Sequence, residues 1–308
     1  MEYEIIQHDQ IQGVKLLLDD ISYRTPHMHR EFEVILVLSG TLLISCLNGQ
    51  VFAEPGEMAI LNPWQTHEFH TRNGLATCLF VQVQPEVFRG YFPAAARLRF
   101  QSATLRNMPE RTQDELRRIM LSMGLAYFAM APRYEFVSMQ RLNRLFELLL
   151  QDGDWTMLSS EQTQHEAAAQ QRLERVMQFV QANYQQKLFL KQVAEQEHLS
   201  ESYMTHFVQE HLNMTFQNYV ALTRFQHARQ LLESTEMSVV EICSECGFSD
   251  RRYLNKICLQ ETGMTPKEYR RTQARRGQMH SGAGVGTLER IYTDAEALAF
   301  LKALERES

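Results

Sequence analysis

The chain has 308 residues, which is long enough for two domains that each bury a core. Its composition, 44% apolar and 22% charged, is that of an ordinary globular protein, and no apolar run approaches the ~20 residues that span a bilayer. Five scattered cysteines argue against a disulfide framework, and the acidic start lacks the basic residues of a signal peptide. We expect a cytoplasmic protein that does not bind membranes.

The first 105 residues alternate short β-prone runs with turn signals. Runs such as Phe32–Leu38 and Thr77–Val83 are rich in β-branched and aromatic residues. The dipeptides Asn48–Gly49, Pro55–Gly56 and Asn73–Gly74 are typical of tight turns between such runs. Many short strands joined by regular turns predict a β-sandwich or a small barrel.

A histidine motif lies within this predicted β domain. His27 and His29 are two residues apart, Glu33 follows four residues later, and His67 belongs to a later run. Residues two apart on a strand point to the same face, so in a barrel both histidines can meet His67 in the interior. The spacing resembles the first motif of cupin domains, whereas Pro63–His67 only approximates the second motif.

Three interpretations of this histidine motif remain open. In metal-dependent cupins the matching residues hold a divalent ion, which suits imidazoles and a carboxylate. In sensory barrels of the same fold they hydrogen-bond a small molecule, and an aromatic side chain such as Trp64 can stack on a sugar ring. The histidines can also line a polar barrel mouth without binding a ligand. We assign the motif to a ligand pocket and expect neither a metal nor a cofactor. The pocket residues are His27, His29, Glu33, Trp64 and His67.

The pattern becomes helical in residues 106–151. Two apolar stripes, Leu116–Met123 and Leu142–Leu149, flank the break at Ala131–Pro132 and predict two helices. Residues 152–169 contain Asp-Gly-Asp and a run rich in glutamine and alanine, which we interpret as an interdomain linker.

Residues 190–271 contain the same structural unit twice, about fifty positions apart. Each copy predicts a short helix, a tight turn and a second helix. In the first copy Ser200 is a natural N-cap for the second helix. In the second copy Ser238 and Glu241 form a capping box, and Gly247 supplies the left-handed residue that ends the first helix. The repeat therefore predicts two helix-turn-helix units.

This repeat resembles the DNA-binding domain of the AraC/XylS family of transcription regulators. The most specific part is Gly-Phe-Ser-Asp-x-x-Tyr-Leu at Gly247–Leu254, followed by Gly-x-Thr-Pro-x-Glu-Tyr-Arg at Gly263–Arg270. The resemblance implies that the second helix of each unit lies in the major groove of DNA. It also implies that residues 106–151 form an antiparallel helical pair that mediates dimerisation, and that the barrel binds an effector such as a sugar.

The outward positions of the two second helices are the candidate DNA contacts. In the first unit they are Ser202, Thr205, His206 and Gln209. In the second unit they are Arg251, Arg252, Asn255 and Lys256. The family often has arginine and lysine at the last two positions of the first set, so this helix should make fewer contacts. We expect the second unit to carry most of the affinity and base discrimination.

The net charge of −6 is unevenly distributed along the chain. Residues 1–169 carry 14 Lys and Arg against 20 Asp and Glu, whereas residues 170–280 carry 14 against 12. DNA binding must therefore depend on locally placed basic residues and be sensitive to salt. The basic candidates are Lys187, Arg224, Arg229, Arg251, Arg252, Lys256, Arg270 and Arg271.

The last 32 residues, 277–308, lie outside the family pattern. The glycine-rich stretch 281–286 predicts a flexible break, and Thr293 with Glu296 caps a short amphipathic helix. The predicted fold class is α+β. Its parts are a cupin-like ligand-sensing barrel (1–105), a helical dimerisation segment (106–151), a linker (152–169), an all-α tandem helix-turn-helix domain (170–276) and a flexible tail with a short helix (277–308).

These features together predict a sequence-specific transcription regulator that is controlled by a small molecule and is not an enzyme. Its expected partners are a double-stranded DNA operator, the effector, a second copy of the chain and, for an activator, RNA polymerase. One rival is a metal-dependent cupin enzyme with an accessory helical domain. Such an enzyme would not need two helix-turn-helix units, and it would need an intact second cupin motif, which this sequence only approximates. Another is a DNA-binding module whose barrel serves only as a dimerisation scaffold.

Overall fold

The computed structural model describes residues 2–4, 6–46, 49–71, 74–212, 214–262, 264–276 and 288–307. The chain forms two compact units. The barrel unit comprises Glu4–Arg24, Met28–Thr163 and Leu288–Ser308, and the helical unit comprises Met1–Tyr3, Thr25–His27 and Gln164–Thr287. Four features of the sequence prediction lie outside the described residues, namely Asn48, Asn73, Gly263 and the stretch 281–286.

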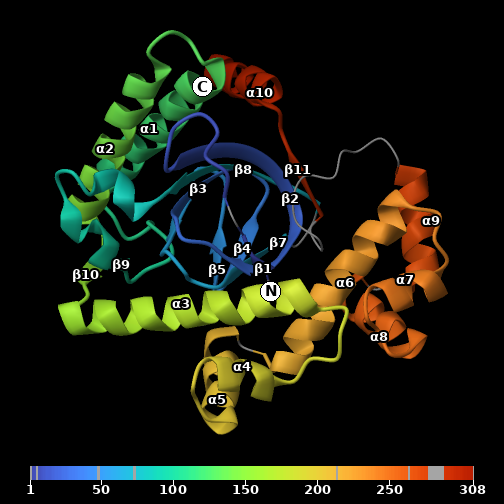
Figure 1. Ribbon diagram of the computed structural model, residues 1–308. Helices are drawn as coiled ribbons and strands as arrows, with labels where there is room; N and C mark the ends of the chain where they lie inside the picture. Colours follow the sequence, from blue (N-terminus) through green and yellow to red (C-terminus); the bar gives the residue numbers. More distant parts are fainter. Residues whose placement is uncertain are drawn as a thin grey trace. The chain divides into compact units, whose positions relative to one another are not determined.

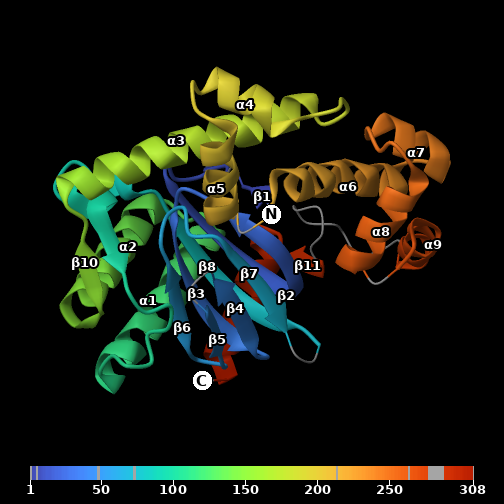
Figure 2. The same cartoon turned by 90° about the horizontal axis from the view of Figure 1, so that it is seen from below.

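The barrel unit is built on an antiparallel sheet, as Figure 2 shows. The strands follow the order β5-β4-β7-β2-β8-β3-β6, and β1 and β11 also pair with β2. A separate two-stranded ribbon is formed by β9 and β10. The strands are β1 (Glu2–Tyr3), β2 (Val14–Met28), β3 (Phe32–Ser39), β4 (Leu42–Cys46), β5 (Gly49–Ala53), β6 (Met58–Leu61), β7 (His67–Thr71), β8 (Ala76–Val83), β9 (Leu98–Phe100), β10 (Trp155–Met157) and β11 (Leu288–Ile291). The predicted barrel is confirmed.

The two faces of the central strands are both buried. On β3, Val34 and Leu36 belong to the core that the barrel shares with the helices, whereas Ile35 and Val37 belong to the core inside the barrel. Side chains on a strand alternate between the faces, so a strand that is covered on both sides reads as a continuous apolar run. This explains why the sequence from Phe32 onward shows no apolar-polar alternation.

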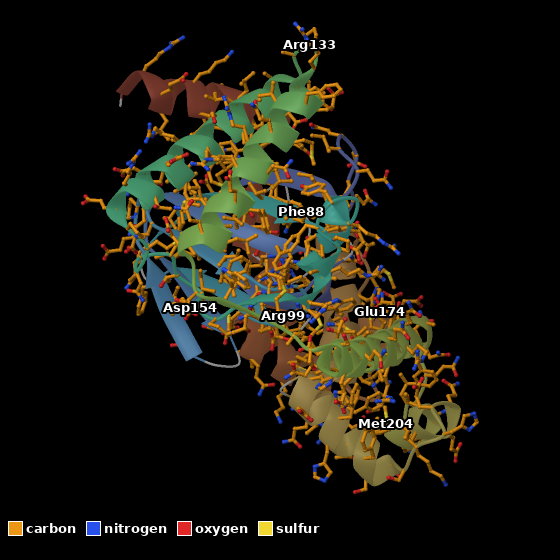
Figure 3. The ribbon with its side chains drawn as sticks, turned by 90° about the vertical axis from the view of Figure 1, so that its left-hand side faces the viewer. Phe88, Arg99, Arg133, Asp154, Glu174 and Met204 are labelled. Carbon is orange, nitrogen blue, oxygen red and sulfur yellow. The ribbon has the colours of Figure 1, made fainter. Side chains whose placement is uncertain are left out.

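Helices α1 (Glu110–Ala129) and α2 (Tyr134–Asp152) cover the outside of the barrel (Figure 1). Their predicted apolar stripes are buried in the core that they share with β3 and β8. Figure 3 shows this layer with its side chains and labels Phe88, whose ring lies 4.6 Å from that of Phe146 on α2. Because packing on the barrel buries both stripes, neither of them forms an exposed apolar patch. Dimerisation stays a prediction.

The segment predicted as a linker is structured. It contains β10, which pairs with β9, and the first turns of α3 (Ser160–Asn183). Ser159 and Gln162 form a reciprocal cap, because the Gln162 amide donates to Ser159 Oγ at 3.1 Å and the Ser159 amide donates to Gln162 Oε1 at 2.8 Å. Alanine, glutamine and glutamate all have high helix propensity, so the run that was interpreted as a linker continues a capped helix.

The tail is also structured between residues 288 and 307. Strand β11 pairs with β2, and helix α10 (Asp294–Glu307) packs against α1. Thr293 and Glu296 form the predicted capping box, with the Thr293 amide 2.9 Å from Glu296 Oε2. The expectation of a flexible tail is therefore wrong for this stretch, because its apolar helix face has a place in the barrel unit's core.

The helical unit contains two helix-turn-helix pairs joined by one long helix, α6 (Figure 1). Its helices after α3 are α4 (Leu190–Gln196), α5 (Glu201–Leu212), α6 (Phe216–Ser234), α7 (Val239–Glu245), α8 (Arg251–Thr262) and α9 (Pro266–Arg276). The Ser238–Glu241 capping box is present at α7, and Gly247 has the predicted left-handed φ of +73°. Within the part of the chain that the structure describes, we find no helix long and apolar enough to cross a membrane.

Candidate functional site

The second helix of each helix-turn-helix pair presents one polar face to solvent. On α5, Met204, Phe207 and Val208 are buried, and Met204 is labelled in Figure 3. On α8, Leu254 and Cys258 are buried. All eight predicted DNA-contact positions are exposed: Ser202, Thr205, His206, Gln209, Arg251, Arg252, Asn255 and Lys256. The period of 3.6 residues separates the two faces, as the sequence indicated.

The N-terminus of α8 orients one of these side chains. Asp250 caps the helix, with its Oδ1 accepting from the Arg252 amide at 2.7 Å. Its Oδ2 also lies 2.9 Å from Nη2 of Arg252, and this guanidinium is the main cause that lowers the pKa of Asp250. An ion pair this exposed is readily exchanged for a contact with a base or a phosphate.

Three of the predicted basic contacts serve the fold instead. Arg224 donates to the backbone carbonyls of Tyr184 and Gln186 at 2.7 and 2.6 Å. Arg270 donates to two carbonyls at and just after the end of α6, at 3.3 and 2.6 Å. Arg229 is only 7% exposed and lies over an aromatic ring. Arg224 and Arg270 satisfy carbonyls that a helix end would leave open, whereas Arg229 is buried against the ring of Tyr269. All three side chains therefore have a role in the fold that the sequence did not indicate. The exposed candidates that remain are Lys187, Arg251, Arg252, Lys256 and Arg271.

The barrel brings together four of the five predicted pocket residues. His27 and His29 lie at and just beyond the end of β2, Glu33 is on β3 and His67 begins β7. Nε2 of His67 is 3.3 Å from Oε2 of Glu33, and Nε2 of His29 is 3.5 Å from Oε1. Each of the three histidines offers a nitrogen within 4.8 Å of the others. None of the four residues is more than 2% exposed.

Backbone carbonyls select the tautomer of two of these rings. Nδ1 of His27 lies 2.8 Å from the Thr25 carbonyl, and Nδ1 of His67 lies 2.7 Å from the Gln65 carbonyl. A carbonyl oxygen can only accept, so Nδ1 carries the proton in both rings. When such a ring is neutral, it presents the lone pair of Nε2 to the cluster, which is also the arrangement of metal-binding histidines. When His67 is protonated, its Nε2 instead carries a proton toward Oε2 of Glu33.

The cluster contains a buried ion pair. Burial opposes ionisation of Glu33, yet His29 and then His67 hold the pKa of this carboxyl well below its ordinary value. Burial likewise opposes the charged form of His29, but the Glu33 carboxylate holds the pKa of that ring above its ordinary value. In a low-dielectric interior each charge is stabilised by the other. Removing one partner would leave an uncompensated buried charge, which would destabilise the folded protein.

Sequence reasoning missed a second row of polar residues around this pair. Nε2 of Gln82 donates to Glu33 Oε1 at 2.7 Å, and Oε2 of Glu31 lies 3.6 Å from Nδ1 of His29. Gln82 is 1% exposed and lies in the otherwise apolar run Cys78–Val83 of β8. A lone polar residue inside an apolar run was the available signal, because buried polar groups need partners.

Trp64 contacts the cluster through a backbone hydrogen bond. Its amide donates to the His29 carbonyl at 2.7 Å, and it adopts a left-handed φ of 64°. The Arg30 guanidinium lies 5.7 Å from the centre of its ring. The side chain is half-buried, and the cation already stacks where a sugar was expected to stack.

Comparison with known proteins identifies both parts of the chain. Residues 18–185 match the model of the AraC-like ligand binding domain, which is more than half of the 308 residues. The chain belongs to the AraC family. In this AraC-family protein, residues 193–272 also match a helix-turn-helix domain model.

Three known proteins illustrate how much of the chain is similar to each of them. The HTH-type transcriptional activator RhaS of Salmonella heidelberg (strain SL476) is 24% identical over 264 residues, which cover 80% of this chain and 87% of RhaS. The melibiose operon regulatory protein of Escherichia coli (strain K12) is 29% identical over 114 residues, which cover 37% of this chain and 38% of that protein. The structure of ToxT from Vibrio cholerae, solved with a bound unsaturated fatty acid, is 10% identical and has a TM-score of 0.48. The match covers 86% of this chain and 97% of ToxT. The chain spans less than half the length of several of the curated relatives that it matches.

Proposed function

We propose that the protein is a cytoplasmic, sequence-specific DNA-binding transcription regulator whose activity is controlled by a small molecule bound in the barrel. The observation that supports it best is the tandem helix-turn-helix arrangement, in which α5 and α8 both bury their apolar side and expose the polar side that would meet DNA. The proposal does not include catalysis.

For DNA reading, each second helix would lie in a major groove. Arginine pairs with two acceptors of guanine and asparagine pairs with adenine, and α8 carries Arg251, Arg252 and Asn255 on its exposed face. On α5 the predicted contact residues Ser202, Thr205 and Gln209 are uncharged, so they are weaker partners for phosphates. The second unit therefore supplies most of the affinity and most of the base preference.

For sensing, the effector would bind at His27, His29, Glu33 and His67. Hydroxyl groups donate to a carboxylate and accept from a protonated imidazole, so a sugar or another polyol suits a buried His29–Glu33 pair. The melibiose operon regulatory protein among the relatives is consistent with this class. The effector acts by favouring one sensor conformation, and the response is limited by its difference in affinity between the two states.

A second candidate is a regulator whose barrel holds a divalent transition metal. Three histidines with nitrogens within 4.8 Å of one another favour it, as do the Nδ1–carbonyl contacts of His27 and His67. Glu33 would provide a carboxylate ligand, and nitrogen and oxygen donors of this kind suit zinc, iron or nickel. The ion would displace the proton of His29 and present a positive charge to an effector.

The decisive experiment compares effector response in the parent and in two variants. An operator is first selected from random double-stranded DNA, and sugars are screened by calorimetry. His29→Ala should weaken the effector response at least tenfold without changing operator binding in the absence of effector. His70→Ala, a partly exposed histidine on β7, is the matched control. A normal response in His29→Ala would refute the pocket assignment.

Metal analysis separates the two candidates. Protein purified without added metal and exchanged against a chelator is analysed for zinc, iron and nickel. Stoichiometric metal in the parent, lost in His67→Ala, would place the metal ahead of the sugar-like effector. A metal-free protein that still responds to a sugar supports the first candidate.

A further inference from the structure

Two arginines on α3 contact the end of α4, the first helix of the first helix-turn-helix pair. Nε and Nη2 of Arg175 both donate to the Glu197 carboxylate, at 2.5 and 2.7 Å. Nε of Arg172 lies 3.5 Å from the same carboxylate. Glu197 is the C-cap of α4, and only 10% of its side chain is exposed. A two-pronged contact fixes direction as well as distance, so the end of α4 is held against α3.

Arg172 also contacts α5 through two aromatic rings. Its guanidinium carbon lies 5.6 Å from the centre of the Tyr203 ring and 5.2 Å from that of Phe207. Its Nη1 donates to the Tyr203 hydroxyl at 3.2 Å. Figures 1 and 2 both show α4 and α5 beside α3. We call Arg172, Arg175, Glu197 and Tyr203 the arginine clamp, because together they hold both helices of the first pair to α3.

The turn between these two helices is strained. His198 follows the C-cap of α4 and has a left-handed φ of 55°. In the second pair the residue after the C-cap of α7 is Gly247, with a φ of 73°. Glycine adopts this conformation readily, whereas a histidine does so at a cost. The first turn is therefore less favourable by itself and depends more on contacts from outside it.

The clamp contacts the side of α5 that adjoins its predicted DNA-contact face. Tyr203 and Phe207 are one helical turn apart, and their rings are nearly parallel, at 17°. They directly follow Ser202 and His206 in the chain, and successive helix positions differ by about 100° around the axis. A contact on this side opposes rotation of α5 about its own axis. Side chains that recognise a ligand must be held to within about 10–20°, so such a rotation would change what the contact face reads.

The second pair differs at the matched positions. Tyr253 is the third residue of α8, as Tyr203 is of α5. Tyr253 is 60% exposed, and within the described part of the chain its hydroxyl has no hydrogen-bond partner. The C-cap of α7 is Cys246, a buried thiol in place of the carboxylate of Glu197. The chain thus contains its own comparison for the clamp.

We propose that Arg172 is a positioning residue for DNA recognition: through Tyr203 and Glu197, the arginine clamp sets the orientation in which α5 presents its contact face to the major groove. The proposal rests on the proposed function, in which α5 lies in that groove. The base preference of the first unit then depends on α3, although no residue of the clamp contacts a base. The second unit does not share this dependence.

Base preference of the full-length protein tests the proposal. Binding is measured by fluorescence anisotropy at fixed salt, on an operator selected from random double-stranded DNA and on its single-base variants. Bases are assigned to α5 where Thr205→Ala or Gln209→Ala discriminates less than the parent, and to α8 where Asn255→Ala does so. The proposal is overturned if no base is assigned to α5.

Tyr203→Phe is the most selective change, because it removes only the hydroxyl that Arg172 contacts. It should lower discrimination at the α5 bases at least threefold and leave the α8 bases at the parental value. Tyr253→Phe, the matched change on α8, should leave the α5 bases at the parental value. Parental discrimination at the α5 bases in Tyr203→Phe would overturn the proposal.

Two changes at Arg172 separate positioning from a direct contact with DNA. Arg172→Ala should lower discrimination at the α5 bases at least fivefold. Arg172→Lys should do nearly the same, because an ammonium group keeps the charge but lacks the planar fork that stacks on the rings. The salt dependence of binding should stay parental in both. A direct phosphate contact predicts instead that Arg172→Ala lowers the salt slope by about 1 and that lysine restores it, and this result would overturn the proposal.

Thermal unfolding of each variant, followed by circular dichroism, separates positioning from a purely structural role. A purely structural role predicts a lower Tm with parental base preference, which would overturn the proposal. The proposed function fails separately, because it is refuted if the parent selects no operator at all. Parental discrimination by Arg172→Ala, in a protein that does bind its operator, refutes the positioning role alone.

Discussion

Removing the side chain of Asn255 is the sharpest test of how DNA is read. The residue lies on the exposed face of α8 beside buried Leu254, so Asn255→Ala removes no core contact. A surface change of this kind alters the free energy of unfolding by less than ~0.5 kcal/mol. Any loss of DNA affinity therefore reports the contact itself rather than a damaged fold.

The expected loss follows from the chemistry of the amide. A bidentate contact from asparagine to adenine contributes about 1–3 kcal/mol of discrimination. Since about 1.4 kcal/mol corresponds to a tenfold change, the dissociation constant at the cognate site should rise ~5- to 150-fold. Asn255→Ala should also discriminate less between the four bases at the one operator position that the asparagine contacts. Lys256→Ala, which removes an exposed cation of α8 that is not assigned to a base, should weaken binding to all sequences and lower the salt slope by about 1.

Fluorescence anisotropy at fixed salt, on the selected operator and on single-base variants, measures both quantities. Lys302→Ala, which removes an exposed charge from α10 in the barrel unit, controls for general electrostatics. Parental affinity and base preference in Asn255→Ala, together with loss of both in His206→Ala on α5, would contradict the prediction. That result would assign recognition to the first unit.

Three further changes test the fold. Gly247→Ala should lower the stability of the helical unit by more than about 1 kcal/mol in urea denaturation, because φ is +73° and a Cβ would lie 2.5 Å from the Gln185 carbonyl oxygen. Arg270→Ala should cost about 1–3 kcal/mol of stability and leave the salt slope of DNA binding unchanged, since its bonds go to backbone carbonyls. Burial raises the pKa of Asp19 from 3.8 to about 6, so folding takes up a proton, and the barrel should lose on the order of 3 kcal/mol as pH rises from about 4 to about 6. Asp19→Asn should remove this part of the pH dependence; an unchanged profile would contradict it.

The DNA-binding unit was predictable because its signals are local. The Ser238–Glu241 cap, the left-handed Gly247 and the spacing of buried residues on α5 and α8 each involve a few neighbouring positions. Such short-range preferences are expressed in almost any tertiary setting. The structural bonds of Arg224 are not local, since this side chain donates to carbonyls 38 and 40 positions away, and no sequence pattern indicates them.

The sensor cluster was predictable only in part. Two histidines on one strand and the spacing to Glu33 are sequence features, whereas the approach of His67 requires the barrel to bring β7 to β3. The bond from Gln82 to Glu33 spans 49 positions, and strand pairing alone decides it. The apolar residues around Gln82 indicate that this glutamine is buried, but no local pattern identifies the carboxylate that it faces.

Residues 288–307 show most clearly what the sequence determines and what the tertiary structure decides. The sequence determined that residues from Thr293 onward form a capped amphipathic helix, because the cap and the apolar period lie within that stretch. Only the tertiary structure decided where its apolar face is buried. The hydroxyl of Tyr292 donates to Asp20 at 2.8 Å, across 272 positions, and Leu301 fills the space above Gly124. The hydrophobic effect is not directional, so the apolar face of a helix shows that it packs against another surface but not which one. The packing of the whole domain determines that surface.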